Sequence, residues 1–307
     1  MTLKNRMVVC ALTRQRAQRQ GAERGTPNEL HVEYYSKRAA DAGMVLTECS
    51  WVSKNGDAFP GSTGIANDKH EEGWKRVTEA VHKQNGCIFL QIWHGGRAVH
   101  PNQADGERTI GPSPKPINGK IWVNNAFVPH VAPSEATKDD IKRVVEDFRK
   151  GAKRAKRAGF DGLELHGANG YIIDQFLRTR ANERTDEYGG SIENRSRLCL
   201  EVLDQLIAVF GSTRVGIKLS PVNDYNDMAD EDPVALTDYL IEKFNEKDLG
   251  FVELTEGFSL EGRDTQLRRE FYKDRPEKSF REIFKKKFKN VWVTNYALTQ
   301  ETGNKAL

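Results

Sequence analysis

The chain of 307 residues is long enough for one large domain or two ordinary ones, and an apolar fraction of 37% supports a sizeable core. The 47 basic and 44 acidic residues nearly balance, with a net charge of +3, which gives no general reason to expect nucleic acid or a membrane as partner. No window approaches the roughly 18 apolar residues of a membrane span, and the N-terminus has no charged-then-apolar signal segment.

The four cysteines, Cys10, Cys49, Cys87 and Cys199, lie far apart and form no Cys-x-x-Cys pair. Three of them fall in or beside apolar runs, so we expect reduced and buried thiols in a reducing compartment. The chain is therefore predicted to be cytoplasmic, or at least not secreted.

Short apolar runs rich in β-branched residues recur along the chain and predict strands. Their near-continuous apolarity indicates burial on both faces of a parallel sheet. The runs are Met7 to Leu12, Met44 to Thr47, Cys87 to Trp93, Phe160 to Leu165, Val215 to Leu219, Phe251 to Leu254 and Val291 to Thr294.

The segments between these runs carry helix start and stop signals. Thr137 with Asp140 resembles a capping box, and Gly159 ends the apolar stripe that follows. Asp232 followed by Pro233 predicts an N-cap with proline in the first turn of another helix. Strands and helices thus alternate.

This alternation, with no Pro/Gly/Ser-rich linker, predicts an α/β fold of the (β/α)8 barrel type in a single domain spanning residues 1–307. A doubly wound open sheet is the alternative, but it would usually carry a glycine-rich turn after its first strand. After Leu12 the chain reads Thr13-Arg14-Gln15-Arg16, and neither G-x-G-x-x-G nor G-x-x-x-x-G-K-[ST] occurs anywhere.

Two connections are long. Residues 94–135, rich in proline, form an excursion after the third predicted strand, and residues 167–190 follow the fourth. Connections of this length in compact domains are usually lids or binding elements. The lid-like excursion contains Trp122, Asn124 and Phe127, which are candidates for shaping a substrate.

The end of the fourth predicted strand carries a group of polar side chains. His166, Asn169 and Tyr171 follow the strand within six residues, where ligands bind in parallel α/β proteins. His166 and Asn169 can donate hydrogen bonds to a carbonyl oxygen, and Tyr171 can supply a proton. The trio suits reduction of a conjugated carbonyl compound, although taken alone it fits an ordinary strand-to-helix loop equally well.

Taken together, several segments resemble the old yellow enzyme family, the FMN-dependent ene-reductases built on a (β/α)8 barrel. The stretches that start at His166 and Asn182 are the most specific motifs, and the resemblance extends from Thr2 to about Leu298. The matching segments are Thr2 to Arg6, Ala11 to Arg14, Tyr34-Tyr35, Gln91 to Arg97, His166 to Phe176 and Asn182 to Arg195.

The resemblance implies a role for single residues. Thr13 corresponds to the hydroxyl residue at the flavin C4 carbonyl, and Gln91 to the amide at the flavin pyrimidine edge. His166 and Asn169 correspond to the pair that holds the substrate carbonyl oxygen, and Tyr171 to the proton donor. The implied cofactors are FMN and NADPH or NADH.

The sequence departs from the family pattern at several places. Lys218 stands where the family has arginine facing the flavin N1 and C2 carbonyl; it keeps the charge but lacks the bidentate fork. In the phosphate-binding turn Asn295 matches, while Thr294 replaces a glycine.

The resemblance also predicts that the eighth β/α unit and an N-terminal segment are lacking from the chain. An unclosed barrel would expose two strand edges. We therefore expect either a fragment of a longer product, or a protein partner or self-association that covers the open edge.

Two functions compete. The first is an NAD(P)H-dependent FMN oxidoreductase that reduces the C=C bond of α,β-unsaturated carbonyl compounds, with a small enone or enal as its partner and neither nucleic acid nor membrane. The alternative is a non-catalytic barrel that serves as a structural or interaction subunit of a larger assembly. The departures at Lys218 and Thr294 favour the second, and the intact trio favours the first.

Overall fold

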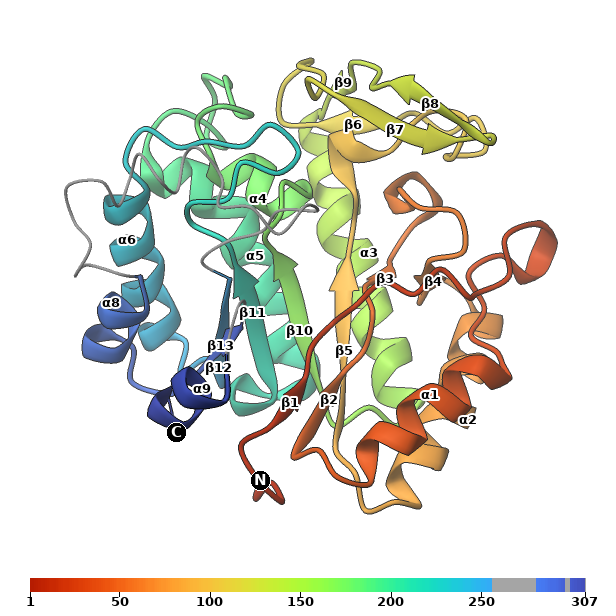
Figure 1. The fold of residues 1–307 in the computed structure, drawn as a ribbon. Helices are drawn as coiled ribbons and strands as arrows, with labels where there is room; N and C mark the ends of the chain where they lie inside the picture. The colour runs from red at the N-terminus through yellow and green to blue at the C-terminus, as the bar shows by residue number, and fades with distance from the viewer. Residues whose placement is uncertain (256–279, 296–298, 307) are drawn as a thin grey trace.

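A parallel sheet forms the centre of the computed structural model, which describes residues 1–255, 280–295 and 299–306. Its strands lie in the order β1-β2-β5-β10-β11-β12-β13, and all neighbouring pairs are parallel. The sheet curls, so that β1 and β13 approach the same side of the molecule (Figure 1). The strands are β1 (Val8–Val9), β2 (Met44–Leu46), β5 (Ile88–Trp93), β10 (Gly162–Gly167), β11 (Val215–Leu219), β12 (Phe251–Thr255) and β13 (Val291–Asn295).

These strands coincide with the predicted apolar runs, and helices on the outer side connect them. The fold is therefore of the predicted (β/α) barrel type. Within the described part of the chain, β1 and β13 stand at the two ends of the strand order. The helices are α1 (Glu29–Ala39), α2 (Asp68–His82), α3 (Lys138–Arg157), α4 (Ile172–Leu177), α5 (Ile192–Phe210), α6 (Pro233–Glu246), α8 (Phe280–Lys287) and α9 (Gln300–Ala306).

The predicted helix signals are found where the sequence places them. The Thr137 hydroxyl accepts from the Asp140 amide at 3.1 Å, and the Asp140 carboxylate accepts from the Thr137 amide at 2.9 Å, which completes the capping box of α3. Gly159 takes a left-handed φ of 88° just beyond α3. Asp232 caps α6 by accepting from the Ala235 amide at 2.9 Å. Local hydrogen bonds of this kind fix helix ends without help from distant parts of the chain.

The proline-rich excursion after β5 folds into two small sheets at the upper edge of the barrel (Figure 1). The first pairs β6 (Ile110–Gly111) with β9 (Ser134–Glu135), and the second pairs β7 (Lys120–Val123) with β8 (Ala126–Pro129). Asn124 and Asn125 connect β7 to β8 with φ of 52° and 62°, the type I′ geometry of a two-residue hairpin. Two short strands, β3 (Ser50–Trp51) and β4 (Thr63–Gly64), extend the central sheet beside β5.

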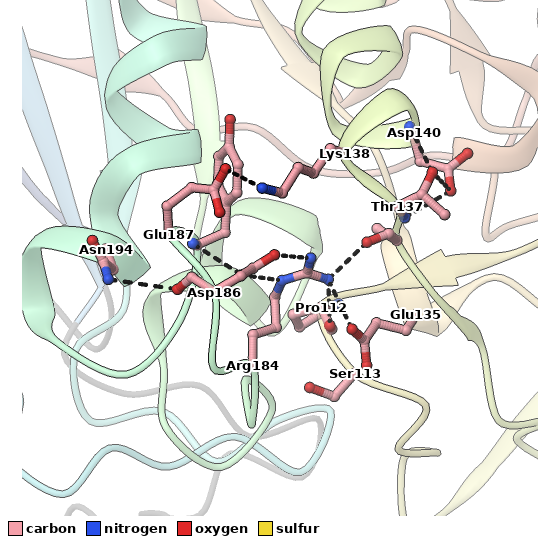
Figure 2. A network of polar contacts seen from close by, with 12 residues as sticks. Pro112, Ser113, Glu135, Thr137, Lys138, Asp140, Arg184, Asp186, Glu187 and Asn194 are labelled. Carbon is pink, nitrogen blue, oxygen red and sulfur yellow. Dashed lines mark hydrogen bonds and ion pairs between the residues drawn. The ribbon is translucent and has the colours of Figure 1, made fainter.

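A buried arginine joins the base of this excursion to the loop after α4 (Figure 2). Arg184, 4% exposed, donates to both carboxylate oxygens of Asp186 at 2.9 and 2.6 Å. It also donates to the carbonyl oxygens of Pro112 at 3.0 Å and Ala136 at 2.7 Å. The motif from Asn182 to Arg195, one of the two most specific in the sequence, therefore holds the base of this excursion in place.

The cysteines are only partly as predicted. Cys49 and Cys199 are buried and all four thiols are free, but Cys10 is exposed and Cys87 is half-buried. The expectation of buried thiols was wrong for Cys10 because it follows β1, which stands at one end of the strand order and pairs with β2 on one side only among the described strands. No helix among the described residues is long and apolar enough to cross a membrane.

Candidate active site

The predicted trio lies in the sharp turn between β10 and α4. Asn169 and Gly170 both adopt left-handed backbone conformations, with φ of 58° and 72°. Asparagine tolerates this region and glycine enters it freely. A Cβ on Gly170 would lie 2.6 Å from the Cβ of Asn226, so no larger residue fits there without movement. The turn brings Tyr171 back over His166, with ring centroids 4.9 Å apart.

His166 is held as a neutral donor. Its Nδ1 accepts from the backbone amide of Ala168 at 3.3 Å, which places the ring proton on Nε2. Burial, with a further contribution from the Lys218 charge, holds the pKa of His166 well below its ordinary value. The imidazole is therefore uncharged at neutral pH and keeps an Nε2–H group for a ligand.

Asn169 is oriented in the same way by the loop after β11. Its side-chain oxygen accepts from the Asn223 amide at 2.8 Å, and its backbone oxygen accepts from the Asn226 amide at 2.9 Å. Its own backbone amide donates to the Ser220 hydroxyl at 2.8 Å. Because the oxygen is engaged, the side-chain nitrogen of Asn169 is the group left to donate to a ligand.

Tyr171 is packed among aromatic rings, edge-on to Trp93 at 5.0 Å and to Phe59 at 6.3 Å. Its side chain is nearly buried, and burial followed by the charge of Tyr225 raises its pKa well above the ordinary value. The hydroxyl hydrogen-bonds with Tyr225 and Asn226. Tyr171 therefore keeps its proton at neutral pH.

Asn223, Tyr225 and Asn226 were not among the predicted site residues. All three follow β11, at the same edge of the sheet as the trio, and Asn226 contacts both Asn169 and Tyr171. The rule that polar groups after parallel strands face a ligand would have identified them. Their specific partners depend on the β10–β11 register, which the sequence does not reveal.

Three of the predicted cofactor residues belong to one buried polar cluster inside the barrel. Gln91 donates its amide to Glu164 at 2.6 Å, and Lys218 donates to Glu253 at 2.9 Å. Asn295, at the end of β13, also donates to Glu253. Glu164 and Glu253 thus connect Gln91, Lys218 and Asn295 across β5, β10, β11, β12 and β13.

Thr13 lies apart from this cluster, exposed beyond the end of β1. Its hydroxyl is 3.2 Å from the Cys49 sulfur. Cys49 is buried and packs in the same apolar cluster as Trp93 and Tyr171. The structure therefore places Thr13 beside the aromatic side of the trio and away from the charged cluster.

A cavity of about 820 Å³ opens between the hairpin β7–β8 and the loop after β11. Trp122 and Phe127 line it, with their rings 4.9 Å apart, whereas Asn124 forms the hairpin turn and does not. Tyr225 and Asn226 also line the cavity and contact the Tyr171 hydroxyl. These two residues connect the cavity to the trio.

Polar groups gathered at the carboxyl edge of a curled parallel sheet define a ligand-binding (β/α) barrel. The sequence profile of the NADH:flavin oxidoreductase / NADH oxidase family matches residues 1–296. The chain therefore belongs to this family, that of the old yellow enzymes.

Curated relatives agree with this assignment. The chain is 43% identical over 238 residues to the flavin oxidoreductase hxnT of Emericella nidulans. This match covers 78% of this chain and 61% of that protein. It is 42% identical over 261 residues to a probable flavin mononucleotide-dependent alkene reductase of Leishmania infantum, over 83% of this chain and 70% of that protein. The match thus spans less than two thirds of the Emericella protein's length.

Solved structures show the same fold. The old yellow enzyme homologue from Zymomonas mobilis superposes with a TM-score of 0.90 at 34% identity, covering 100% of this chain and 82% of that one. Morphinone reductase superposes with a TM-score of 0.87 at 35% identity, covering 98% of this chain and 78% of that one. The (β/α)8 fold class is confirmed.

Proposed function

We propose that the protein is an FMN-dependent oxidoreductase that uses NADPH or NADH to reduce the C=C bond of small α,β-unsaturated carbonyl compounds. The observation that carries this proposal is the orientation of the trio. His166 and Asn169 each have one polar atom fixed by the protein and a donor left over, and Tyr171 stands beside them with a retained proton. Two donors and an acid suit an enone, whose oxygen gains negative charge as its β-carbon takes a hydride and loses that charge when its α-carbon takes a proton.

Residues of the barrel interior, together with Thr13 beyond the end of β1, carry groups that suit the ring system of FMN. Its pyrimidine edge carries carbonyl oxygens and an N–H group, which require donors and an acceptor in alternation. Lys218 supplies a cationic donor, Thr13 a hydroxyl, and Gln91 an amide whose oxygen accepts. For the phosphate, the described residues offer Asn295 at the end of β13, and Thr294 beside it is partly buried. We propose Thr13, Gln91, Lys218 and Asn295 as the cofactor-binding residues.

FMN, when bound, supplies the hydride chemistry between nicotinamide and substrate. The role proposed for His166 and Asn169 is to hold the carbonyl oxygen and stabilise the charge that develops there. Tyr171 delivers its proton to the α-carbon. Tyr225 and Asn226 line the cavity and contact the Tyr171 hydroxyl, so they restrict the position of its proton.

The test uses the full chain reconstituted with FMN. Anaerobic addition of NADPH should bleach the flavin absorption, and an enone such as cyclohexenone should restore it. Uptake of FMN without either response would overturn the proposal and favour the alternative of a non-catalytic barrel. Failure to take up FMN would do the same.

We also infer one domain over residues 1–307, which the continuous sheet from β1 to β13 supports. A cytoplasmic location is consistent with the four free thiols. A protein partner or a second copy that pairs with β1 or β13, the two end strands of the described part of the chain, stays a prediction, and sedimentation analysis would test self-association.

A further inference from the structure

Two carboxyl groups face each other inside the barrel. Glu164 on β10 is 0% exposed and Glu253 on β12 is 1% exposed. In the strand register Glu164 lies opposite Gly216 of β11, and Glu253 lies opposite Lys218, two residues farther along the same strand. The two carboxyl groups lie within hydrogen-bonding contact. Two buried carboxylates so close would repel strongly.

The hydrogen bonds of the pair are incomplete if both groups are ionised. Glu164 accepts from Gln91 through Oε2, and Glu253 accepts from Lys218 and Asn295 through Oε1. The other two oxygens, Oε1 of Glu164 and Oε2 of Glu253, are buried with no partner among the described residues. Leaving each oxygen buried without a hydrogen bond costs free energy, and one proton between the two oxygens would give both a hydrogen-bond partner.

The neighbouring charges agree with one negative charge on the pair. Lys218 is the cation that faces it from β11, while Gln91 on β5 and Asn295 on β13 are neutral amides. His166 lies beside Lys218 in the strand register and is itself neutral. Below the pair, the cluster of Met44, Leu46, Phe89 and Phe251 is apolar. One cation therefore balances one carboxylate.

The pKa shifts of the two glutamates have opposite directions. Burial first, and then the charge of Glu253, raise the pKa of Glu164 well above its ordinary value. Burial alone would raise the pKa of Glu253 as well, but Lys218 and the hydrogen bonds from its neighbours hold it below its ordinary value. These directions place the proton on Glu164.

We propose that Glu164 and Glu253 share one proton, carried by Glu164, and that Glu164 is a positioning residue for Gln91. Through Oε2 it holds the amide nitrogen of Gln91, so the amide oxygen faces away and accepts from a ligand N–H group. Through the shared proton it leaves Glu253 ionised to pair with Lys218. The relevance to FMN rests on the proposed function; the shared proton does not.

Carbon-13 NMR of the full chain, labelled at the glutamate carboxyl carbon, tests the proton directly and without FMN. One glutamate resonance should stand at the position of a protonated acid at neutral pH. It should vanish in Glu164→Gln, whose amide reproduces the protonated carboxyl group. In Glu253→Gln it should move to the ionised position, because Glu164 then becomes the only carboxylate available to Lys218.

The matched control is Glu201→Gln. Burial also raises the pKa of Glu201, but it lies on α5 and bonds to Tyr188 outside the barrel, so its replacement should leave the protonated resonance unchanged. The proposal is overturned if every glutamate is ionised at neutral pH in the wild type, or if the protonated resonance disappears with Glu201. The wild type, Glu253→Gln and the control decide the question even if Glu164→Gln fails to fold.

The positioning role has its own readout in the side-chain amide resonances of Gln91, assigned by their loss in Gln91→Glu. Glu164→Ala should shift and broaden them, and Glu164→Gln should restore their position. Unchanged Gln91 resonances in Glu164→Ala would overturn the positioning role. Because neither NMR test uses FMN, failure of the flavin assay would leave these results standing.

Discussion

The Arg184 cluster and the trio at the end of β10 both belong to the most specific motifs of the sequence, yet they differ in how their hydrogen bonds are used. Arg184 donates to Asp186, Pro112 and Ala136 and is directed wholly at the protein (Figure 2). His166 and Asn169 each use one side-chain atom in a hydrogen bond to the protein and retain a second side-chain group that can donate. Saturated bonds indicate architecture, and a fixed group with a remaining donor indicates a ligand site.

The largest expected effect on either region is a loss of turnover when the trio is changed. Tyr171→Phe should slow enone reduction by about 10²–10⁴-fold, because a general acid is lost while ring packing against Trp93 remains. Stopped-flow measurement should find flavin reduction by NADPH unchanged. If flavin reduction slowed and the enone half-reaction did not, Tyr171 would not be the acid.

The largest effect on folding should come from the other region. Arg184→Ala removes the ion-pair partner of Asp186 and the hydrogen-bond donor to the carbonyl oxygens of Pro112 and Ala136. We expect the free energy of unfolding to fall by about 3 kcal/mol. Urea unfolding measures it. Arg180→Ala is the control, since Arg180 is 51% exposed and pairs with Asp227 at the surface, where a change well under that of Arg184 is expected. If Arg184→Ala and Arg180→Ala lowered the free energy of unfolding equally, the structural role assigned to Arg184 would be wrong.

A smaller effect should separate ligand binding from folding at the trio. His166→Ala or Asn169→Ala should weaken binding of a phenol or carbonyl ligand by about 1–3 kcal/mol, because a buried oxygen loses a donor. Spectral titration of the FMN-loaded protein measures it. The urea midpoint should move less than in Arg184→Ala, and the reverse order would count against the assignment.

Two buried histidines and the Arg184–Asp186 pair should respond to acid in different pH ranges. Burial lowers the pKa of His94, beside the trio, to about 3, and that of His70 to about 4. The unfolded chain titrates near 6.5, so their contribution is complete above about pH 6.5 and falls by about 1.4 kcal/mol per pH unit per histidine below it. The hydrogen bond from Arg184 lowers the pKa of Asp186, so that pair loses its contribution only below about pH 4.

Urea unfolding across this pH range is the measurement, and His70→Gln should reduce the slope between about pH 6.5 and 4. Arg184→Ala should leave that slope unchanged and reduce the loss below about pH 4. A stability that stayed flat down to pH 4 would contradict the assignment of neutral buried histidines.

The strands and caps could be predicted because they depend on local chemistry. The apolar runs from Ile88 and Val215 are buried on both faces, and Thr137 finds its partner three residues away. The trio was predictable as a group, because one turn holds all three residues.

The orientation of the site could not be predicted, because it depends on the register between strands. Asn223 fixes Asn169 from a loop far along the chain, and Glu253 reaches Lys218 through the pairing of β11 with β12. Glu164 and Glu253 did leave a signal in the sequence, namely a charged residue within an otherwise apolar strand, but that signal does not say which groups meet.

In the part of the chain that the structure describes, the hairpin β7–β8 forms a two-stranded sheet that shares no strand with the barrel. Its turn is closed by Asn124 and Asn125 alone, and Trp122 and Phe127 project from it into the cavity wall. Changes in its length or aromatic residues therefore leave the β-ladders of the barrel intact. The substrate-shaping role predicted for Trp122 and Phe127 can therefore diverge among descendants of one ancestral gene, or in a laboratory library, without change to the strands that carry the predicted trio.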